Sequence, residues 1–241
     1  MFYLYLLLAL ALLVAATFIA PLRHKVWVAF TAVTVAAVAV AIPSIGVLAG
    51  AGEIELIQSI DSPLGVGSLS IDALSAMFLL IIGLAGMATI LYSRGYLAHY
   101  LTKKSSAHIS LHYTALALLV LSMMLVVMAD GSFLFLFAWE LMTIASFLLI
   151  LFDAERAEVL RAALAYLVMM HIGFIFLVAG FVGIDSICGN SSFDWLAVCF
   201  ANGENTYIFI LFLLGFGMKA GLFPMHVWLP EAHPAAPSHV S

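Results

Sequence analysis

The sequence is organised as a series of long apolar runs separated by short polar or proline-containing stretches. A helix needs about 20 residues to span the hydrocarbon layer of a membrane, and most of the runs are close to that length. The pattern predicts a bundle of about seven transmembrane helices, at Phe2–Ala20, Val26–Ile45, Ala73–Tyr92, His112–Ala129, Phe133–Phe152, Ala162–Ile184 and Tyr207–Phe223.

Two connections are longer than the others. Glu53–Ser70 contains a proline and two glycines in its centre, which predict a turn-rich hairpin lying on the membrane face. Asp185–Thr206 is rich in Gly, Asn and Ser and is expected to form a second loop on the same side. The first run, Phe2–Ala20, has no preceding Lys or Arg and exceeds the roughly 7–15 apolar residues of a signal peptide. We therefore interpret it as a retained transmembrane helix.

Composition excludes an ordinary soluble domain. Of the 241 residues, 66% are hydrophobic and 9% charged, and the mean hydropathy is +1.21, whereas soluble domains carry about 25% charged residues. Helices satisfy their own backbone hydrogen bonds in a bilayer. We predict one all-α transmembrane domain over residues 1–241, multi-pass in the inner cell membrane. The net charge of −5 and the absence of a basic run give no sign of a nucleic-acid partner.

Basic residues gather in alternate connections. Every Lys and Arg except Lys219 follows the first, third or fifth predicted helix, at Arg23, Lys25, Arg94, Lys103, Lys104, Arg156 and Arg161. The intervening connections carry Asp and Glu. Because loops rich in Lys and Arg stay on the cytoplasmic side, we expect an extracytoplasmic N-terminus and a seventh helix that runs inward.

Glu140 is an ionisable residue inside the fifth predicted helix, eight residues past Ser132. At 1.5 Å per residue it lies about 12 Å into the layer. Ionisable side chains at such depth are costly and by default functional, facing a protein interior or a water-filled cavity. The alternative is a protonated glutamate that only hydrogen-bonds a neighbouring helix.

Lys219 shares this interior, about 20 Å in from Tyr207 by the same rise. Three glycines surround it and Pro224 follows, so the seventh helix is expected to break beside the lysine. A discontinuous helix exposes carbonyls and admits water at mid-membrane. The alternative is a lysine that snorkels to the cytoplasmic interface. Glu140 and Lys219 together have the chemistry of a proton-transfer pair, since each changes the proton affinity of the other.

Histidines add further candidates. His171 lies in the sixth predicted helix, where imidazole can relay protons or serve as a hydrogen-bonded structural group. A second set near the C-terminus has metal-ligand chemistry, but its spacing matches no helical zinc motif and prolines interrupt it; these residues are His226, Glu231, His233 and His239. We expect no metal, and no cofactor motif is present. Cys188 and Cys199 share a loop, and their pairing stays open.

The C-terminal run KAGLFPMHVWLPEAHPAAPSHVS, Lys219–Ser241, closely resembles the signature of the proton-conducting membrane subunits of respiratory complex I, Mrp-type cation/proton antiporters and membrane-bound nickel–iron hydrogenases. The segment DGSFLFLFAWELMTIASFLLI resembles the glutamate-bearing helix of that family. Within this run, the segment HVWLPEAHPAAPSHVS is most similar to the branch of hydrogenase-4 component B and the formate hydrogenlyase membrane subunit. The resemblance covers the chain from the fourth predicted helix onward, and the first three helices more loosely.

By this resemblance, Glu140 matches the family glutamate of helix five and Lys219 the lysine of the broken helix seven. His233 and His239 lie where the chain turns towards an eighth helix, which implies a relay role for them. Residues 1–111 then hold helices one to three, and residues 112–241 an incomplete first half-channel. We expect the sequence to be the N-terminal part of a family subunit.

The resemblance implies a proton-translocating subunit of a membrane-bound hydrogenase or an NADH-quinone oxidoreductase-like complex, without a redox centre of its own. Its expected partners are the lipid bilayer, other membrane subunits and, through them, a peripheral redox arm. Two alternatives stay open: a Na⁺/H⁺ antiporter subunit of the Mrp type, and a scaffold remnant that anchors partner subunits without conducting.

Overall fold

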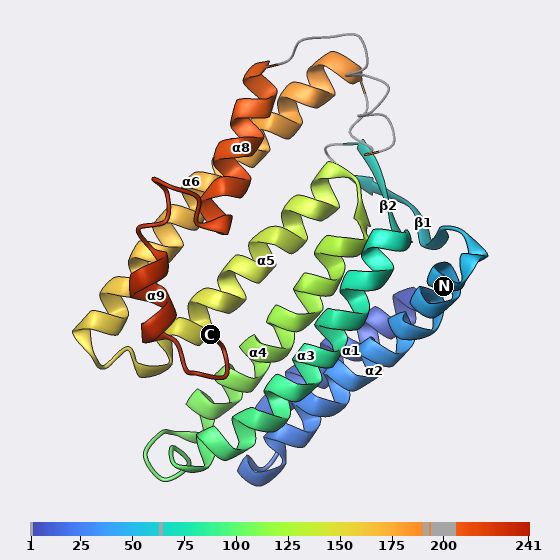
Figure 1. Ribbon diagram of the computed structural model, residues 1–241. Helices are drawn as coiled ribbons and strands as arrows, with labels where there is room; N and C mark the ends of the chain where they lie inside the picture. Colours follow the sequence, from blue (N-terminus) through green and yellow to red (C-terminus); the bar gives the residue numbers. More distant parts are fainter. Residues whose placement is uncertain (1, 63–64, 190–192, 194–205) are drawn as a thin grey trace.

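The computed structural model describes residues 2–62, 65–189, 193 and 206–241. Long helices run up and down in a bundle, and a small sheet lies at one end (Figure 1). In chain order the main elements are α1 (Phe2–Ile19), α2 (Lys25–Gly46), β1 (Ile54–Ser62), β2 (Gly65–Ile71), α3 (Ala73–Ala98), α4 (Ser106–Met128), β3 (Ala129–Asp130), α5 (Ser132–Ile150), α6 (Ala157–Cys188), α8 (Thr206–Ala220) and α9 (Leu229–Ala235).

Each predicted apolar run coincides with a helix, α1 to α6 and α8. Within the described part of the chain, five helical segments are long and apolar enough to cross a membrane, and α8 is a shorter apolar helix. The chain is therefore a mostly helical, multi-pass membrane protein.

Several helices extend beyond the predicted apolar runs. α3 continues to Ala98, α4 already begins at Ser106, and α6 covers Ala157–Cys188. A polar cap stabilises one of these ends. Ser105 accepts a hydrogen bond from the His108 backbone N–H at the start of α4. Hydropathy does not detect such ends, because they lie in polar sequence.

The predicted hairpin at Glu53–Ser70 is confirmed. β1 and β2 pair in antiparallel fashion, with Ile54 opposite Ile71, and the short β3 adds to β2. Asp72 then caps α3 by accepting the Ser75 backbone N–H at 2.7 Å, and the hydrogen bonds from Ser75 hold the pKa of its carboxyl group below the usual range. The sheet lies at the end of the bundle opposite the three basic connections (Figure 1).

Small residues allow close contact among the first four helices. α3 carries Gly83 against Ala37 of α2 and Gly86 against Val120 of α4. A methyl group added at Gly86 would lie 2.6 Å from the nearest carbon of Val120. Close approach through small residues is a common way for transmembrane helices to gain packing contacts.

The prediction that Lys25 lies in a loop is wrong. Lys25 is the first residue of α2, and only 1% of it is exposed. Its ammonium group donates to the carbonyl of Thr17 on α1 and to the hydroxyl of Ser110 on α4. Ser110 in turn donates to the carbonyls of Thr17 and Ser106. Among the ion pairs of the described residues, none includes Lys25, so neutral groups alone satisfy this buried cation.

We predict opposite effects for two substitutions at this contact. Lys25→Met should leave the free energy of unfolding unchanged or raise it, since an apolar side chain of similar length avoids burying a charge. Ser110→Ala should lower it by about 1–3 kcal/mol, because the buried ammonium group loses an acceptor. Unfolding in mixed detergent micelles measures both. A loss of stability in Lys25→Met as large as in Ser110→Ala would contradict this account.

Candidate functional site

Glu140 lies in the middle of α5 and contacts α6 directly. Its Oε1 is 3.0 Å from Nε2 of His171. The other ring nitrogen of His171, Nδ1, donates to the carbonyl of Leu167 at 2.9 Å. The Glu140 side chain is 21% exposed and that of His171 48%, so the pair extends from the interior to the bundle surface.

These two contacts determine how many protons the pair holds. A carbonyl only accepts, so Nδ1 of His171 carries a proton. The short contact between Nε2 and Oε1 then needs one more proton, either on the imidazole or on the carboxyl group. The Glu140–His171 pair is therefore arranged to share one proton between an acid and a base.

Lys219 reaches the same stretch of α5 from α8. Its ammonium group donates to the Thr143 hydroxyl at 2.9 Å and to the Trp139 carbonyl at 3.3 Å, and lies 4.5 Å from the centre of the Trp139 ring. A cation over an aromatic face is electrostatically stabilised. Lys219 also occupies the last turn of α8, where the helix dipole favours a positive charge.

Lys219 on α8 contacts the stretch of α5 that carries Glu140, but the two side chains form no direct ion pair. Among the ion pairs of the described residues, Glu140 contacts His171. The site thus has three members, Glu140, His171 and Lys219, from three helices.

The predicted break beside Lys219 is present. α8 ends at Ala220, and Gly221 adopts a positive φ of +70°, a conformation that glycine reaches without a steric penalty. The chain then turns until α9 begins. The Trp228 indole donates to the carbonyl of Met218 at 2.8 Å, and the Leu222 N–H to the carbonyl of Gly217 at 2.9 Å. Carbonyls of the last turn are thereby partnered within the protein.

Two glycines hold α6 against α8 near the site. A Cβ at Gly173 would lie 2.8 Å from the Met218 Cβ and 3.1 Å from the Gly215 carbonyl oxygen. A Cβ at Gly215 would lie 3.0 Å from the Gly173 carbonyl oxygen. This backbone contact holds the part of α6 that carries His171 close to the part of α8 that carries Lys219.

The two C-terminal histidines do not join this site. His233 is exposed, and its carbonyl accepts a hydrogen bond from the Ser241 hydroxyl. His239 is buried, and its Nε2 lies 2.7 Å from Nε2 of His112 on α4. Sequence analysis did not single out His112, although it shares with His171 the signal of a histidine within a predicted helix.

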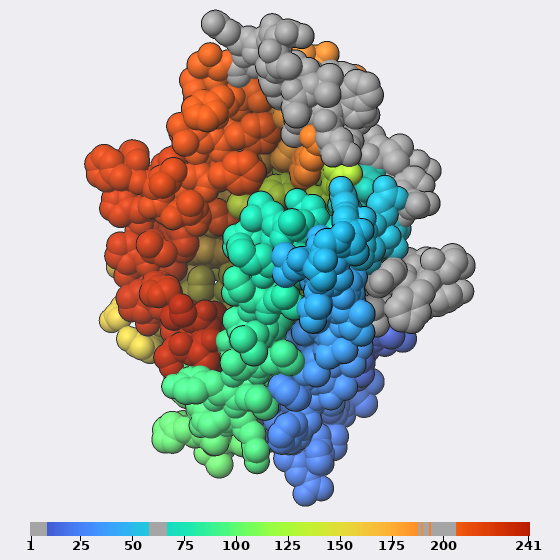
Figure 2. Space-filling model, turned by 45° about the vertical axis from the view of Figure 1, so that its right-hand side comes forward, coloured from blue at the N-terminus to red at the C-terminus, as the bar shows by residue number. Residues whose placement is uncertain are grey.

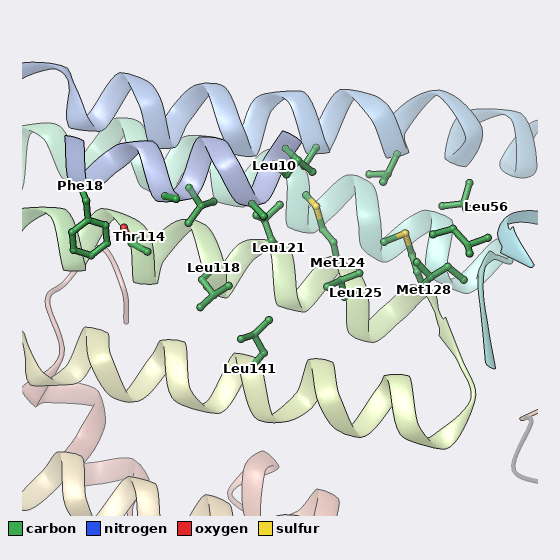
Figure 3. Close-up of a pocket in the computed structure, with 17 residues that line it drawn as sticks. Leu10, Phe18, Leu56, Thr114, Leu118, Leu121, Met124, Leu125, Met128 and Leu141 are labelled. Carbon is green, nitrogen blue, oxygen red and sulfur yellow. The ribbon is translucent and has the colours of Figure 1, made fainter. Parts of the chain in front are cut away.

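Within the described ranges, no group of three or more His, Cys, Asp or Glu side chains could hold a metal ion. Cys199 lies outside the described residues, and its pairing with Cys188 stays open. An apolar groove of about 480 Å³ lies between α1, α4 and α5 (Figure 3). Among the described residues that line it, Thr114 supplies the one polar side chain, and these residues include no ionisable group.

Residues 129–241 match the family model described as NADH:quinone oxidoreductase/Mrp antiporter, transmembrane. An uncharacterised protein of Mycobacterium tuberculosis is 40% identical over 181 residues, which are 74% of this chain and 27% of that protein. Hydrogenase-4 component B of Escherichia coli is 31% identical over 72% of this chain and 25% of its own length. This chain thus spans about a quarter of the length of these relatives.

A solved structure of the membrane-bound sulfane sulfur reductase, an archaeal respiratory membrane complex, contains a chain with the same fold. The TM-score is 0.81 at 20% sequence identity, and the match covers 98% of this chain and 47% of that chain. At this identity the similarity shows the fold alone.

We predict that Gly173→Leu separates α6 from α8. The leucine would overlap Met218 and the Gly215 backbone, and overpacking of this kind costs about 1–3 kcal/mol of stability. Gly95→Leu on α3 is the matched control, because no atom lies within 4 Å of its added Cβ and leucine is the better helix former. Unfolding in detergent should show a loss for Gly173→Leu only; equal stability of both variants would contradict the close contact.

Proposed function

We propose that this chain, which belongs to the NADH:quinone oxidoreductase/Mrp antiporter membrane family, passes protons through a site formed by Glu140, His171 and Lys219. The observation that carries the proposal is the contact between Glu140 and His171, whose geometry requires one shared proton between the two side chains. A group that already shares a proton needs only a small change of its surroundings to release it.

Lys219 supplies that change of surroundings. Its ammonium group contacts Trp139 and Thr143, which lie one and three residues from Glu140 on α5, and a nearby positive charge favours the ionised form of a carboxyl group. Movement of Lys219 away from Trp139 and Thr143 would favour a protonated Glu140, and its return would favour release of the proton. The break after Ala220 supports such movement, because the lysine lies at a helix end. Its two hydrogen bonds to α5 also favour an interior role over snorkelling to the interface.

The partners belong to the same proposal. Hydrogenase-4 component B is by name one component of a larger enzyme, and the archaeal sulfane sulfur reductase is a respiratory membrane complex. We infer that this chain works beside other membrane subunits, with a peripheral redox arm supplying the driving force. The family description also includes Mrp antiporters, so a Na⁺/H⁺ antiporter subunit is the second candidate.

The proposed topology has seven spans with an extracytoplasmic N-terminus. α1 and α8 are shorter than the other spans in the described residues, and α8 continues through the break towards α9. In this proposal, residues 1–111 supply the first three helices, and residues 112–241 contribute to the first half-channel. The segregation of basic residues to one end supports this orientation.

Glu140→Gln should slow proton movement by about a hundredfold or more, the scale of a lost acid–base group, while leaving folding intact. The measurement uses vesicles that hold the chain with its partner subunits, a potassium diffusion potential and an internal pH dye. Lys219→Met should have a comparable effect, and the double variant should be little slower than either, because residues acting as one unit are non-additive.

Glu158→Gln is the matched control, since Glu158 lies exposed at the start of α6 and pairs with Arg156. Glu140→Gln vesicles that conduct at the unsubstituted rate would reduce Glu140 to a structural group. Sodium-dependent proton movement would favour the antiporter, and the absence of any proton movement would favour the scaffold.

The topology predicts the accessibility of introduced cysteines in a background without the native ones. From outside the cell, Glu55→Cys should react with a membrane-impermeant maleimide, and Lys103→Cys should react only after the membrane is opened. The reversed result would overturn the orientation of the bundle.

A further inference from the structure

A groove of about 620 Å³ runs along α6, beside the segment that leads into α9. Leu160, Leu164 and Val168 contribute exposed apolar side chains to its lining. These positions recur every four residues, so they lie on one face of the helix. α9 lies beside α6 in Figure 1, and Figure 2 shows the red C-terminal segment on the surface of the molecule. The groove is therefore an exposed, largely apolar surface.

The length of the groove matches one leaflet of a membrane. Its lining on α6 extends from Ala157 to Met169, which is about 18 Å of helix at 1.5 Å per residue. Half of a hydrocarbon core about 30 Å thick is about 15 Å. The start of α6 follows a basic connection, which the proposed topology places on the cytoplasmic side. The groove thus has room for an acyl chain of the cytoplasmic leaflet.

Contacts within the protein hold the two walls of the groove together. Trp228 lines it, and its indole donates to the Met218 carbonyl at 2.8 Å while its ring centre lies 5.2 Å from that of Tyr166. Ala232 of α9 is buried in a cluster with Ala163 and Tyr166 of α6. The groove is therefore formed by the chain itself and needs no ligand to shape it.

Two charged side chains, Arg161 and Glu231, also line the groove. They form no ion pair with each other, and neither belongs to any ion pair in the described part of the chain. Glu231 is next to Ala232, which packs against Ala163, and Ala163 lies two residues from Arg161. One cation and one anion without a partner therefore flank the end of the groove near the start of α6.

This combination matches the chemistry of a zwitterionic phospholipid. Arginine binds phosphate oxygens through two parallel hydrogen bonds. A carboxylate only accepts hydrogen bonds, so Glu231 needs a donor. A primary ammonium group, as in ethanolamine, supplies three N–H donors, whereas the quaternary ammonium of choline supplies none. A purely anionic headgroup would bring no positive charge to Glu231.

We propose that the groove between α6 and α9 binds one phosphatidylethanolamine molecule. Its phosphate lies at Arg161, its ammonium group at Glu231, and one acyl chain along Leu164 and Val168. The two charges favour a lipid over a transmembrane helix of a partner subunit or of a second copy, because such helices carry few charged residues. The proposal goes beyond the proton path, since it uses none of the residues of the Glu140 site.

Headgroup selectivity is tested on the purified full chain by native mass spectrometry, with phosphatidylethanolamine, phosphatidylcholine and phosphatidylglycerol of identical acyl chains. One phosphatidylethanolamine should bind about tenfold more tightly than either other lipid, the scale of one charge-assisted hydrogen bond. Arg161→Gln should weaken the binding of all three lipids. Glu231→Lys should reverse the preference in favour of phosphatidylglycerol, because the headgroup then meets a second cation.

Arg156→Gln and Glu158→Gln are the matched controls, because these residues form an exposed ion pair near the start of α6. Both variants should bind lipid as the unsubstituted chain does. Equal binding of the three lipids by the unsubstituted chain, or a preference for phosphatidylethanolamine that survives in Glu231→Lys, would overturn the proposal.

The place and the nature of the occupant are tested in vesicles that hold the chain with its partner subunits and equal amounts of the three lipids. A photoreactive diazirine amino acid replaces Leu164 in one variant and Leu84, an exposed residue of α3, in the control. Lipid adducts from position 164 should be enriched in phosphatidylethanolamine over those from position 84. The same lipid composition at both positions, or cross-linking of position 164 to a partner subunit or a second copy, would refute the lipid site.

Discussion

A helix that ends inside an apolar layer must find partners for its freed backbone groups within the protein, since lipid offers none. α8 meets this requirement at Ala220. The Trp228 indole returns to the Met218 carbonyl, and the Leu222 N–H returns to Gly217. These contacts give the Gly217 and Met218 carbonyls partners at the point where the helix ends. They also leave Lys219 in the last helical turn, where its charge is favoured.

α5 is the common surface on which the candidate site is assembled. It presents Glu140 to α6 and, within the same stretch, Trp139 and Thr143 to α8. Glu140 belongs to α5 itself, whereas His171 and Lys219 contact α5 from α6 and α8. The close contact of α6 and α8 completes the arrangement, because it fixes the distance between the two helices that carry the basic groups.

Hydropathy and turn residues predicted the helices, the hairpin and the break after Ala220, because each depends on local composition. They did not predict that Glu140 contacts His171. That contact depends on how each helix is rotated about its axis, and helices that are apolar all round carry no periodic signal for rotation. The pairing of His112 with His239 was missed for a similar reason, as it joins positions distant in sequence. Lys25 was assigned to a loop because a charged residue is expected outside an apolar run, and the sequence does not reveal that Thr17 and Ser110 accept its hydrogen bonds.

The burial of Lys25 has a consequence for the order in which the chain assembles. Its contact with Thr17 joins α1 to α2 as soon as both helices exist, but its contact with Ser110 requires α4, which is synthesised 85 residues later. Until then the ammonium group has an incomplete set of acceptors and remains better placed near water. The set of acceptors around Lys25 is therefore complete only after α4 has been synthesised and has packed against the first two helices.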